Sequence, residues 1–303
     1  MFLNQIFDNK ERPISDGSKK LYTANLTKLN DGNDIVNFIF LKKPSVVMKK
    51  IEHLKPTTQR SYIIAICSVI NNNVPKKLYD EYYIILMDFN RSLKDRTDKT
   101  ETQKENWMTV KEIQDVELKL ETKIKKFRQN RLNKNEYSLI LQHMILSLFT
   151  KIQPRRNKDY SVMKITNSNK EDKKFNYLDM DNKKFIFNNY KTSHTYNTVQ
   201  VDIPDDLFKI IVFYLKFHKE RNKLKNKSYN IDFLVGYSGE AIQSNDVTKN
   251  LNKTFGKNVS SSMLRNIFLS DKYTDMVNEL DEDTKAMGTS IDVALSTYVK
   301  SKN

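Results

Sequence analysis

The chain has 303 residues, which is enough for two domains that each bury a core. Its 38% of hydrophobic and 11% of aromatic residues exclude a globally disordered protein, and its longest apolar runs are too short to span a bilayer. The formal net charge of +15 indicates a polyanionic partner, for which nucleic acid is the commonest candidate.

The numbers and positions of the cysteine and histidine residues indicate the cellular compartment and exclude some kinds of site. The single cysteine, Cys67, excludes an intramolecular disulfide and predicts a reducing, intracellular compartment. Residues 1–13 have no apolar segment typical of a secretory signal. The histidines lie too far apart in the sequence for a structural zinc site, at His53, His143, His194 and His218.

The first part of the chain carries apolar residues at helical spacing. This periodicity predicts short helices over residues 21–29, 47–54, 58–70 and 78–93, with Ser18 as the N-cap of the first and Thr57 or Thr58 as that of the third. We therefore expect a helical N-terminal domain over residues 1–93. Residues 94–106 contain no apolar residue and predict a solvated linker.

The second domain is expected over residues 107–303. Thr109 and Glu112 form a T-x-x-E capping box that begins a helix, and an apolar helix is expected over 136–149. Alternating runs near 175–177, 184–187 and 199–203 predict a small antiparallel sheet of about three strands. Helical patterns follow over 207–217, 244–255, 261–269 and 291–300. The predicted fold class is mainly α (α+β).

Generic enzyme motifs such as a P-loop, G-x-G-x-x-G or G-x-S-x-G are absent from the sequence, so any phosphate must be held by side chains. The segment QPRRNKDY offers Arg155 and Arg156, with Asp159 one helical turn away to hold a guanidinium. Lys191 lies in the turn of a predicted hairpin, from which it could protonate a leaving oxygen. The simpler alternatives are a basic, solvated helix start and a surface lysine.

Two further features lie near the C-terminus. Ser262 and Arg265 share one helical face, and Arg265 stands in an apolar stretch, so it either snorkels to solvent or faces an internal anion. Gly288 predicts a turn before the last helix, and Tyr298 near its end is either a core tyrosine or a nucleophile.

Taken in chain order, these features resemble the catalytic domain of the tyrosine recombinase (phage integrase) family. The matching elements are Arg156, Lys191, Ser262 to Arg265, Met287-Gly288-Thr289 and Tyr298. The helical N-terminal half resembles the family's core-binding (SAM-like) DNA-clamp domain, and the PRRNKDY segment is similar to that of recombinases from large DNA viruses. Ser262 stands where the family usually has histidine, and Thr289 stands where it has histidine or tryptophan. Because a hydroxyl is a poor general base, reduced or absent activity remains an alternative.

The resemblance implies a mechanism without ATP, metal or another cofactor. Arg156 and Arg265 would bind the oxygens of a DNA phosphate, Tyr298 would form a 3′-phosphotyrosyl link, and Lys191 would protonate the 5′ oxygen. Ser262 and Thr289 would add hydrogen bonds. Arg155 remains an alternative to Arg156, which we prefer because Asp159 then occupies the family's acidic position.

The expected partner is double-stranded DNA, on which the protein would assemble as a dimer or tetramer, with no membrane involved. A viral protein of this kind would act in the host nucleus or at a viral replication site. The basic stretches Lys123–Lys134 and Lys216–Lys227 would contact backbone phosphates, or are simply solvated. Alternatives are a type IB topoisomerase-like enzyme, a DNA-binding protein that has lost catalysis, and an RNA-binding helical protein.

Overall fold

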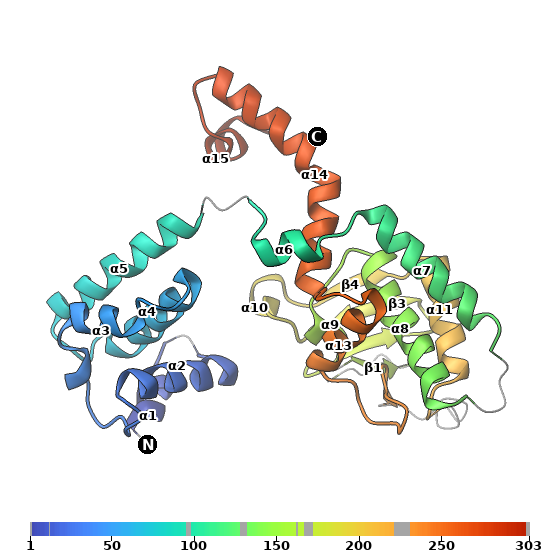
Figure 1. Cartoon of the computed structure of the whole chain (residues 1–303), viewed down its shortest axis with the longest axis horizontal. Coiled ribbons are helices and arrows are strands. Elements are labelled where there is room, and N and C mark those ends of the chain that lie inside the picture. Colours follow the sequence, from blue (N-terminus) through green and yellow to red (C-terminus); the bar gives the residue numbers. More distant parts are fainter. Residues whose placement is uncertain are drawn as a thin grey trace. The chain divides into compact units, whose positions relative to one another are not determined.

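The computed structural model describes residues 2–11, 13–94, 98–127, 132–161, 163–166, 172–220 and 231–300. The chain divides into two compact units, Met1–Lys99 and Thr100–Asn303, and a hydrophobic core lies in each. Helices dominate both units, and a small five-stranded sheet lies in the second (Figure 1). The mainly α (α+β) fold class is confirmed.

The first unit is built around one apolar helix. Its elements are α1 (Phe2–Asp8), α2 (Asp16–Leu29), the 3-10 turn η1 (Ile39–Leu41), α3 (Pro44–Ile51), α4 (Pro56–Ile70) and α5 (Lys76–Lys94). Helix α4 packs against α1, α2 and α5 and buries most of its residues from Tyr62 onward. The four predicted helices are confirmed, whereas α1 was not predicted.

The predicted helix caps in this unit were wrong. Ser15, not Ser18, caps α2, because its hydroxyl accepts a hydrogen bond from the Ser18 backbone at 3.3 Å. Helix α4 begins at Pro56 rather than after Thr57 or Thr58. Proline suits this first position, since its fixed φ is helical and no partner is needed for its missing N–H.

The segment predicted as a linker is partly helical. Helix α6 (Glu101–Asn106) begins with a capping box between Thr100 and Gln103. Asn106 is buried, and its side-chain oxygen accepts a hydrogen bond from the Asn258 backbone at 2.9 Å. The lack of apolar residues in residues 101–106 therefore marks a polar helix joined to the second unit rather than an unstructured spacer.

The core of the second unit is centred on α8 (Lys134–Thr150), which packs against α7 (Val110–Ile124), α11 (Asp205–Lys216) and α13 (Ser244–Phe255). The predicted capping box of Thr109 and Glu112 begins α7, which confirms that prediction. Short helix α9 (Asn157–Ser161) links α8 to the sheet, because Tyr160 contacts Phe149 and Phe187 edge-on, with ring centroids 5.7 and 5.9 Å away.

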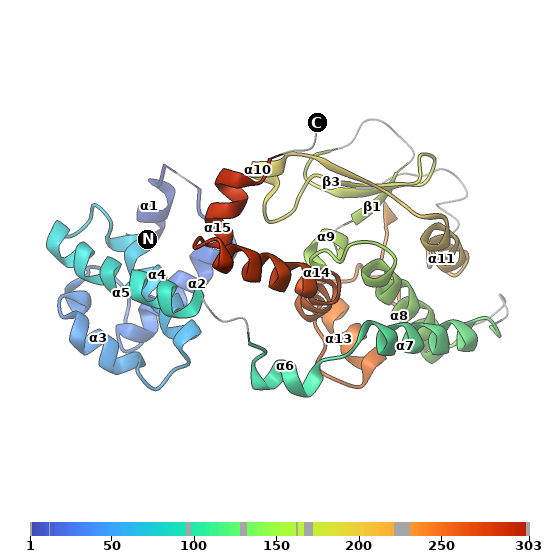
Figure 2. The same ribbon diagram turned by 90° about the horizontal axis from the view of Figure 1, so that it is seen from above.

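The three predicted antiparallel strands are confirmed as β2, β3 and β4, but the sheet has two further strands, β1 and β5, and is mixed. Its strands are β1 (Met163–Thr166), β2 (Asn176–Asp179), β3 (Lys184–Phe187), β4 (Val199–Asp202) and β5 (Ile231–Asp232), in the order β4-β3-β2-β1-β5. β1 and β2 pair in parallel, whereas the other pairs are antiparallel. β5 has two residues, too few to show an alternating pattern in sequence, and the four residues of β1 are mostly buried and do not alternate. Figure 2 shows the sheet together with α8 and α11.

The C-terminal part differs most from expectation. Helix α14 (Ser261–Ala286) has 26 residues, far more than the predicted 261–269, and α15 (Ile291–Val293) and the π-helical turn η2 (Ala294–Tyr298) follow it. The buried residues of α14 are Ser261, Met263, Leu264 and Ile267 at its start and Thr284 near its end. The middle of α14 therefore extends away from the rest of the second unit (Figure 1).

Candidate functional site

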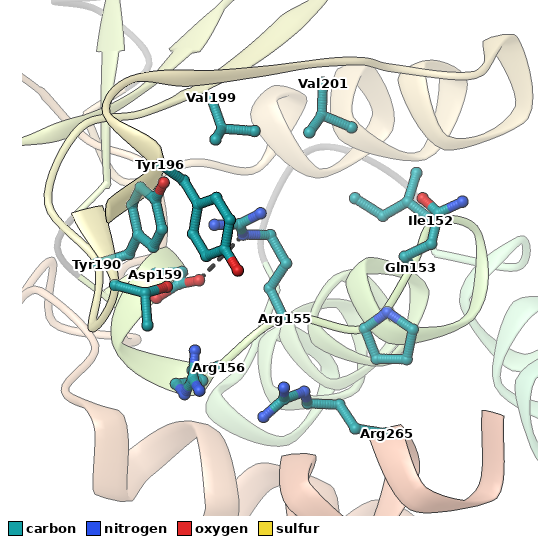
Figure 3. Close-up of a pocket in the computed structure, with 12 residues that line it drawn as sticks. Ile152, Gln153, Arg155, Arg156, Asp159, Tyr190, Tyr196, Val199, Val201 and Arg265 are labelled. Carbon is teal, nitrogen blue, oxygen red and sulfur yellow. Dashed lines mark hydrogen bonds and ion pairs between the residues drawn. The ribbon is translucent and has the colours of Figure 1, made fainter. Parts of the chain in front are cut away.

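A cavity of about 350 Å³ lies in the second unit, where the loop after α8, α9, the β3–β4 connection and the first turns of α14 meet. Figure 3 shows the side chains of Arg155, Arg156 and Arg265 in its wall. The other lining residues are the carboxylate Asp159, the polar Gln153, Tyr190, Thr192 and Tyr196, and the apolar Ile152, Pro154, Val199 and Val201. Three guanidinium groups against one carboxylate suit an anion such as phosphate.

Arg155 is held in one orientation by three neighbours. Its Nε donates to Asp159 Oδ2 at 3.0 Å, and its guanidinium carbon lies 3.8 Å from the ring centre of Phe187 and 5.1 Å from that of Tyr190. Asp159 is 2% exposed, and burial raises the pKa of its carboxyl despite the opposing effect of Arg155. Asp159 thus pairs with Arg155, not with Arg156 as the spacing of the residues suggested.

The buried side chain of Asn176, which was not predicted from the sequence, fixes the position of the β3–β4 connection relative to α9. Asn176 at the start of β2 is fully buried, and its amide nitrogen donates to the carbonyl oxygens of Asp159 at 2.8 Å and Asn189 at 3.1 Å. Its side-chain oxygen accepts from the backbone N–H groups of Asn188 and Asn189, both at 2.8 Å. Asn176 therefore joins α9 to the start of the β3–β4 connection, two walls of the cavity.

Arg156 and Arg265 form ion pairs with none of the described residues. Ser260 caps α14 by accepting a hydrogen bond from the Met263 backbone at 3.2 Å. Met263, Leu264 and Ile267 are buried in the core, and this anchorage brings Arg265 of the same turns to the cavity wall. Arg265 thus lines the cavity, and whether it binds an anion there stays a prediction.

The other predicted site residues lie elsewhere. Lys191 is exposed in the β3–β4 connection, and Ser262 is exposed in the first turn of α14. Thr289 follows α14, and its backbone N–H donates to the Thr284 carbonyl at 2.9 Å. Tyr298 is 59% exposed at the end of η2. None of these four is among the described residues that line the cavity, and their roles stay predictions.

The hairpin contributes residues that the sequence analysis did not consider. Tyr190, Thr192 and Tyr196 line the cavity. Thr192 precedes the short helix α10 (Ser193–Tyr196), and Tyr196 is its last residue. A signal for them is present in the sequence, since Tyr190 and Tyr196 lie within five residues of Lys191 in a turn-rich segment that has no apolar periodicity.

The predicted DNA-contacting stretches fall partly outside the described residues. Within Lys123–Lys134, residues 128–131 lie outside them, and within Lys216–Lys227, residues 221–227 do. Of the described lysines, Lys125 pairs with Glu121 at 2.7 Å on the surface of α7.

No family model, curated protein or solved structure matches this chain. The resemblance to tyrosine recombinases therefore rests on the residues and spacing given above. Within the part of the chain that the structure describes, no group of histidine, cysteine, aspartate or glutamate side chains could hold a metal ion. No helix in that part is long and apolar enough to cross a membrane.

Proposed function

We propose that this protein is a site-specific DNA recombinase or integrase that cleaves and rejoins DNA through a 3′-phosphotyrosyl intermediate. The observation that carries the proposal is the arginine cavity, where Arg155, Arg156 and Arg265 outnumber the single carboxylate of Asp159. A phosphodiester carries one negative charge, and a pentavalent transition state carries two. An excess of two positive charges therefore stabilises the transition state more than the bound substrate.

The chemistry follows from these groups. The Tyr298 hydroxyl gives its proton to solvent water as its oxygen bonds to phosphorus, and the bond from phosphorus to the 5′ oxygen breaks. Lys191 supplies the proton that the 5′ oxygen takes up. The bond energy is kept in the phosphotyrosyl link, so attack by a 5′ hydroxyl rejoins the strand without ATP. Both Lys191 and Tyr298 must approach the cavity for this reaction.

Self-assembly offers a way to bring Tyr298 to an arginine cavity. From Arg265 to the end of α14 at Ala286, the helix rises about 30 Å at roughly 1.5 Å per residue. Its middle turns expose Leu269, Tyr273, Met276 and Val277, which recur at helical spacing on one face. Residues 269–298 carry seven acidic residues and two lysines in a chain of net charge +15. We infer that this acidic, apolar segment docks on a second, basic copy and delivers Tyr298 there.

Mixing two impaired variants tests this assembly. Arg265→Ala keeps the tyrosine, and Tyr298→Phe keeps the cavity, so we expect very slow formation of a covalent adduct with DNA by the first variant alone and none by the second. Their mixture is expected to form adducts on the Arg265→Ala chain, because its Tyr298 can enter the intact cavity of the other variant. A mixture no faster than its components, beside an active wild type, would show that Tyr298 acts within its own chain.

The function itself is tested with a suicide DNA substrate that is nicked beside the cleavage site. We expect a denaturant-stable adduct between protein and DNA, and none with Tyr298→Phe. Relaxation of a one-site supercoiled plasmid without joining of two sites would assign the topoisomerase activity instead. The absence of any adduct, with tight duplex binding, would support the DNA-binding protein without catalysis, which the exposure of Tyr298 away from the cavity favours as the second candidate.

A further inference from the structure

We propose that Tyr196 binds the phosphate in the arginine cavity, its hydroxyl donating a hydrogen bond to a phosphodiester oxygen that the guanidinium groups also hold. The catalytic consequence of this role rests on the proposed recombinase function. The phosphate contact itself does not depend on it. Three features of Tyr196 favour this contact: its exposure, the orientation of its hydroxyl and the fixed position of its loop.

The side chain of Tyr196 is mostly exposed to solvent and is not part of the hydrophobic core. It is 66% exposed although it lines the cavity, and its hydroxyl forms a hydrogen bond with none of the described residues. In Figure 3 its ring lies beside Arg155, with the hydroxyl directed into the space that Arg156 and Arg265 border. An O–H donor in this place can reach the same anion as the guanidinium groups.

Tyr190, which also lines the cavity, differs from Tyr196 in its exposure and in the partner of its hydroxyl. Tyr190 is 7% exposed, and its hydroxyl donates to the Asn197 carbonyl at 2.8 Å. Its ring supports the Arg155 guanidinium from one side. Tyr190 is therefore a structural part of the wall, whereas the hydroxyl of Tyr196 is available to a ligand.

The loop that carries Tyr196 is anchored at both ends. Asn176 holds the backbone of Asn188 and Asn189 before it, and β4 pairs with β3 after it. Within the loop, the Tyr196 and Asn197 N–H groups donate to the carbonyl oxygens of Thr192 at 3.2 Å and Ser193 at 2.8 Å. A donor held in this way loses little conformational freedom when an anion binds.

The cavity also needs such a donor. The resemblance to tyrosine recombinases gives Ser262 and Thr289 the task of donating hydrogen bonds to the phosphate, but neither is among the described residues of the wall. In their place the wall offers the hydroxyls of Thr192 and Tyr196. The hairpin, rather than α14 and the turn after it, thus supplies the uncharged donors of this site.

Binding of the dinucleotide thymidylyl-thymidine, which has one phosphodiester, tests the contact without any reaction. Tyr196→Phe removes the hydroxyl alone, and we expect it to weaken binding about tenfold, since hydrogen bonds to charged groups are among the stronger ones. The matched control is Tyr83→Phe on α5, a 45% exposed tyrosine that is not among the residues lining the cavity, for which unchanged affinity is expected. Equal affinity of Tyr196→Phe and wild type, measured by NMR titration, would overturn the proposal.

The suicide substrate gives the second measurement. Tyr196→Phe should slow adduct formation about 100-fold at saturating DNA, as removal of one oxyanion donor does in other enzymes. If wild type forms no adduct, the recombinase function fails, and the dinucleotide titration still decides the role of Tyr196. Complete loss of the adduct in Tyr196→Phe with dinucleotide binding unchanged would also overturn the proposal, because the phenol would then be the reacting group.

Discussion

Replacing Arg265 with alanine is expected to slow adduct formation on a suicide substrate by about three orders of magnitude, the upper range for loss of one transition-state donor. Arg265 pairs with no described carboxylate, so its full charge is available to the phosphate. Affinity for duplex DNA should change little, because many surface lysines contribute to it. Single-turnover kinetics at saturating DNA, together with a binding isotherm, separate the two effects.

Lys257→Ala is the matched control for this variant. It removes one positive charge just before the same helix, but Lys257 is exposed and is not among the residues that line the cavity. We expect it to leave the rate of adduct formation within about twofold, since an exposed charge outside the site acts only through screened, long-range attraction. Equal rate losses in the two variants would mean that Arg265 acts through general charge and not at the phosphate.

The same assay decides between Arg155 and Arg156. Arg155 stacks on Phe187 and binds Asp159 through Nε, contacts that a lysine cannot reproduce. Arg156 has no such partner among the described residues, so Arg156→Lys should retain more activity than Arg155→Lys if Arg155 is the principal phosphate ligand. The reverse order would support Arg156, the residue favoured by its spacing to Asp159.

Asn176→Leu is expected to lower the free energy of unfolding of the second unit by about 3–5 kcal/mol, because a buried polar group without a partner costs about 1–3 kcal/mol. The substitution has a similar volume but leaves two carbonyl oxygens and two N–H groups unpaired, those of Asp159, Asn188 and Asn189. Urea denaturation followed by tyrosine and tryptophan fluorescence measures the change.

Asn189→Ala provides the comparison. It removes one exposed hydrogen bond, from the side chain of Asn189 to the Lys174 carbonyl at 2.8 Å, and should cost about 1 kcal/mol or less. A urea midpoint for Asn176→Leu that equals that of wild type would show that water or a shift of the loop replaces the lost bonds. The cavity would then not depend on Asn176.

Local signals in the sequence predicted much of the fold. Helices α2 to α5 of the first unit, the capping box that begins α7, and α13 over residues 244–255 follow from interactions between residues that lie within a few positions of each other. The same locality explains the errors. Strands β1 and β5 acquire their pairing only within the sheet, and the parallel pairing of β1 with β2 joins segments separated by a loop.

The features of the candidate site also fall into those that local sequence predicts and those that depend on the fold. The net charge, the arginines at positions 155, 156 and 265 and the loop that carries Lys191 are evident from composition and short spacing alone. That those arginines share one cavity, that Asp159 binds Arg155, and that Tyr196 lines the wall while Tyr298 does not, became evident from the folded chain. These facts depend on the packing of α9, the β3–β4 connection and α14, which burial of a common core brings together although α9 and α14 begin 104 residues apart, at Asn157 and Ser261.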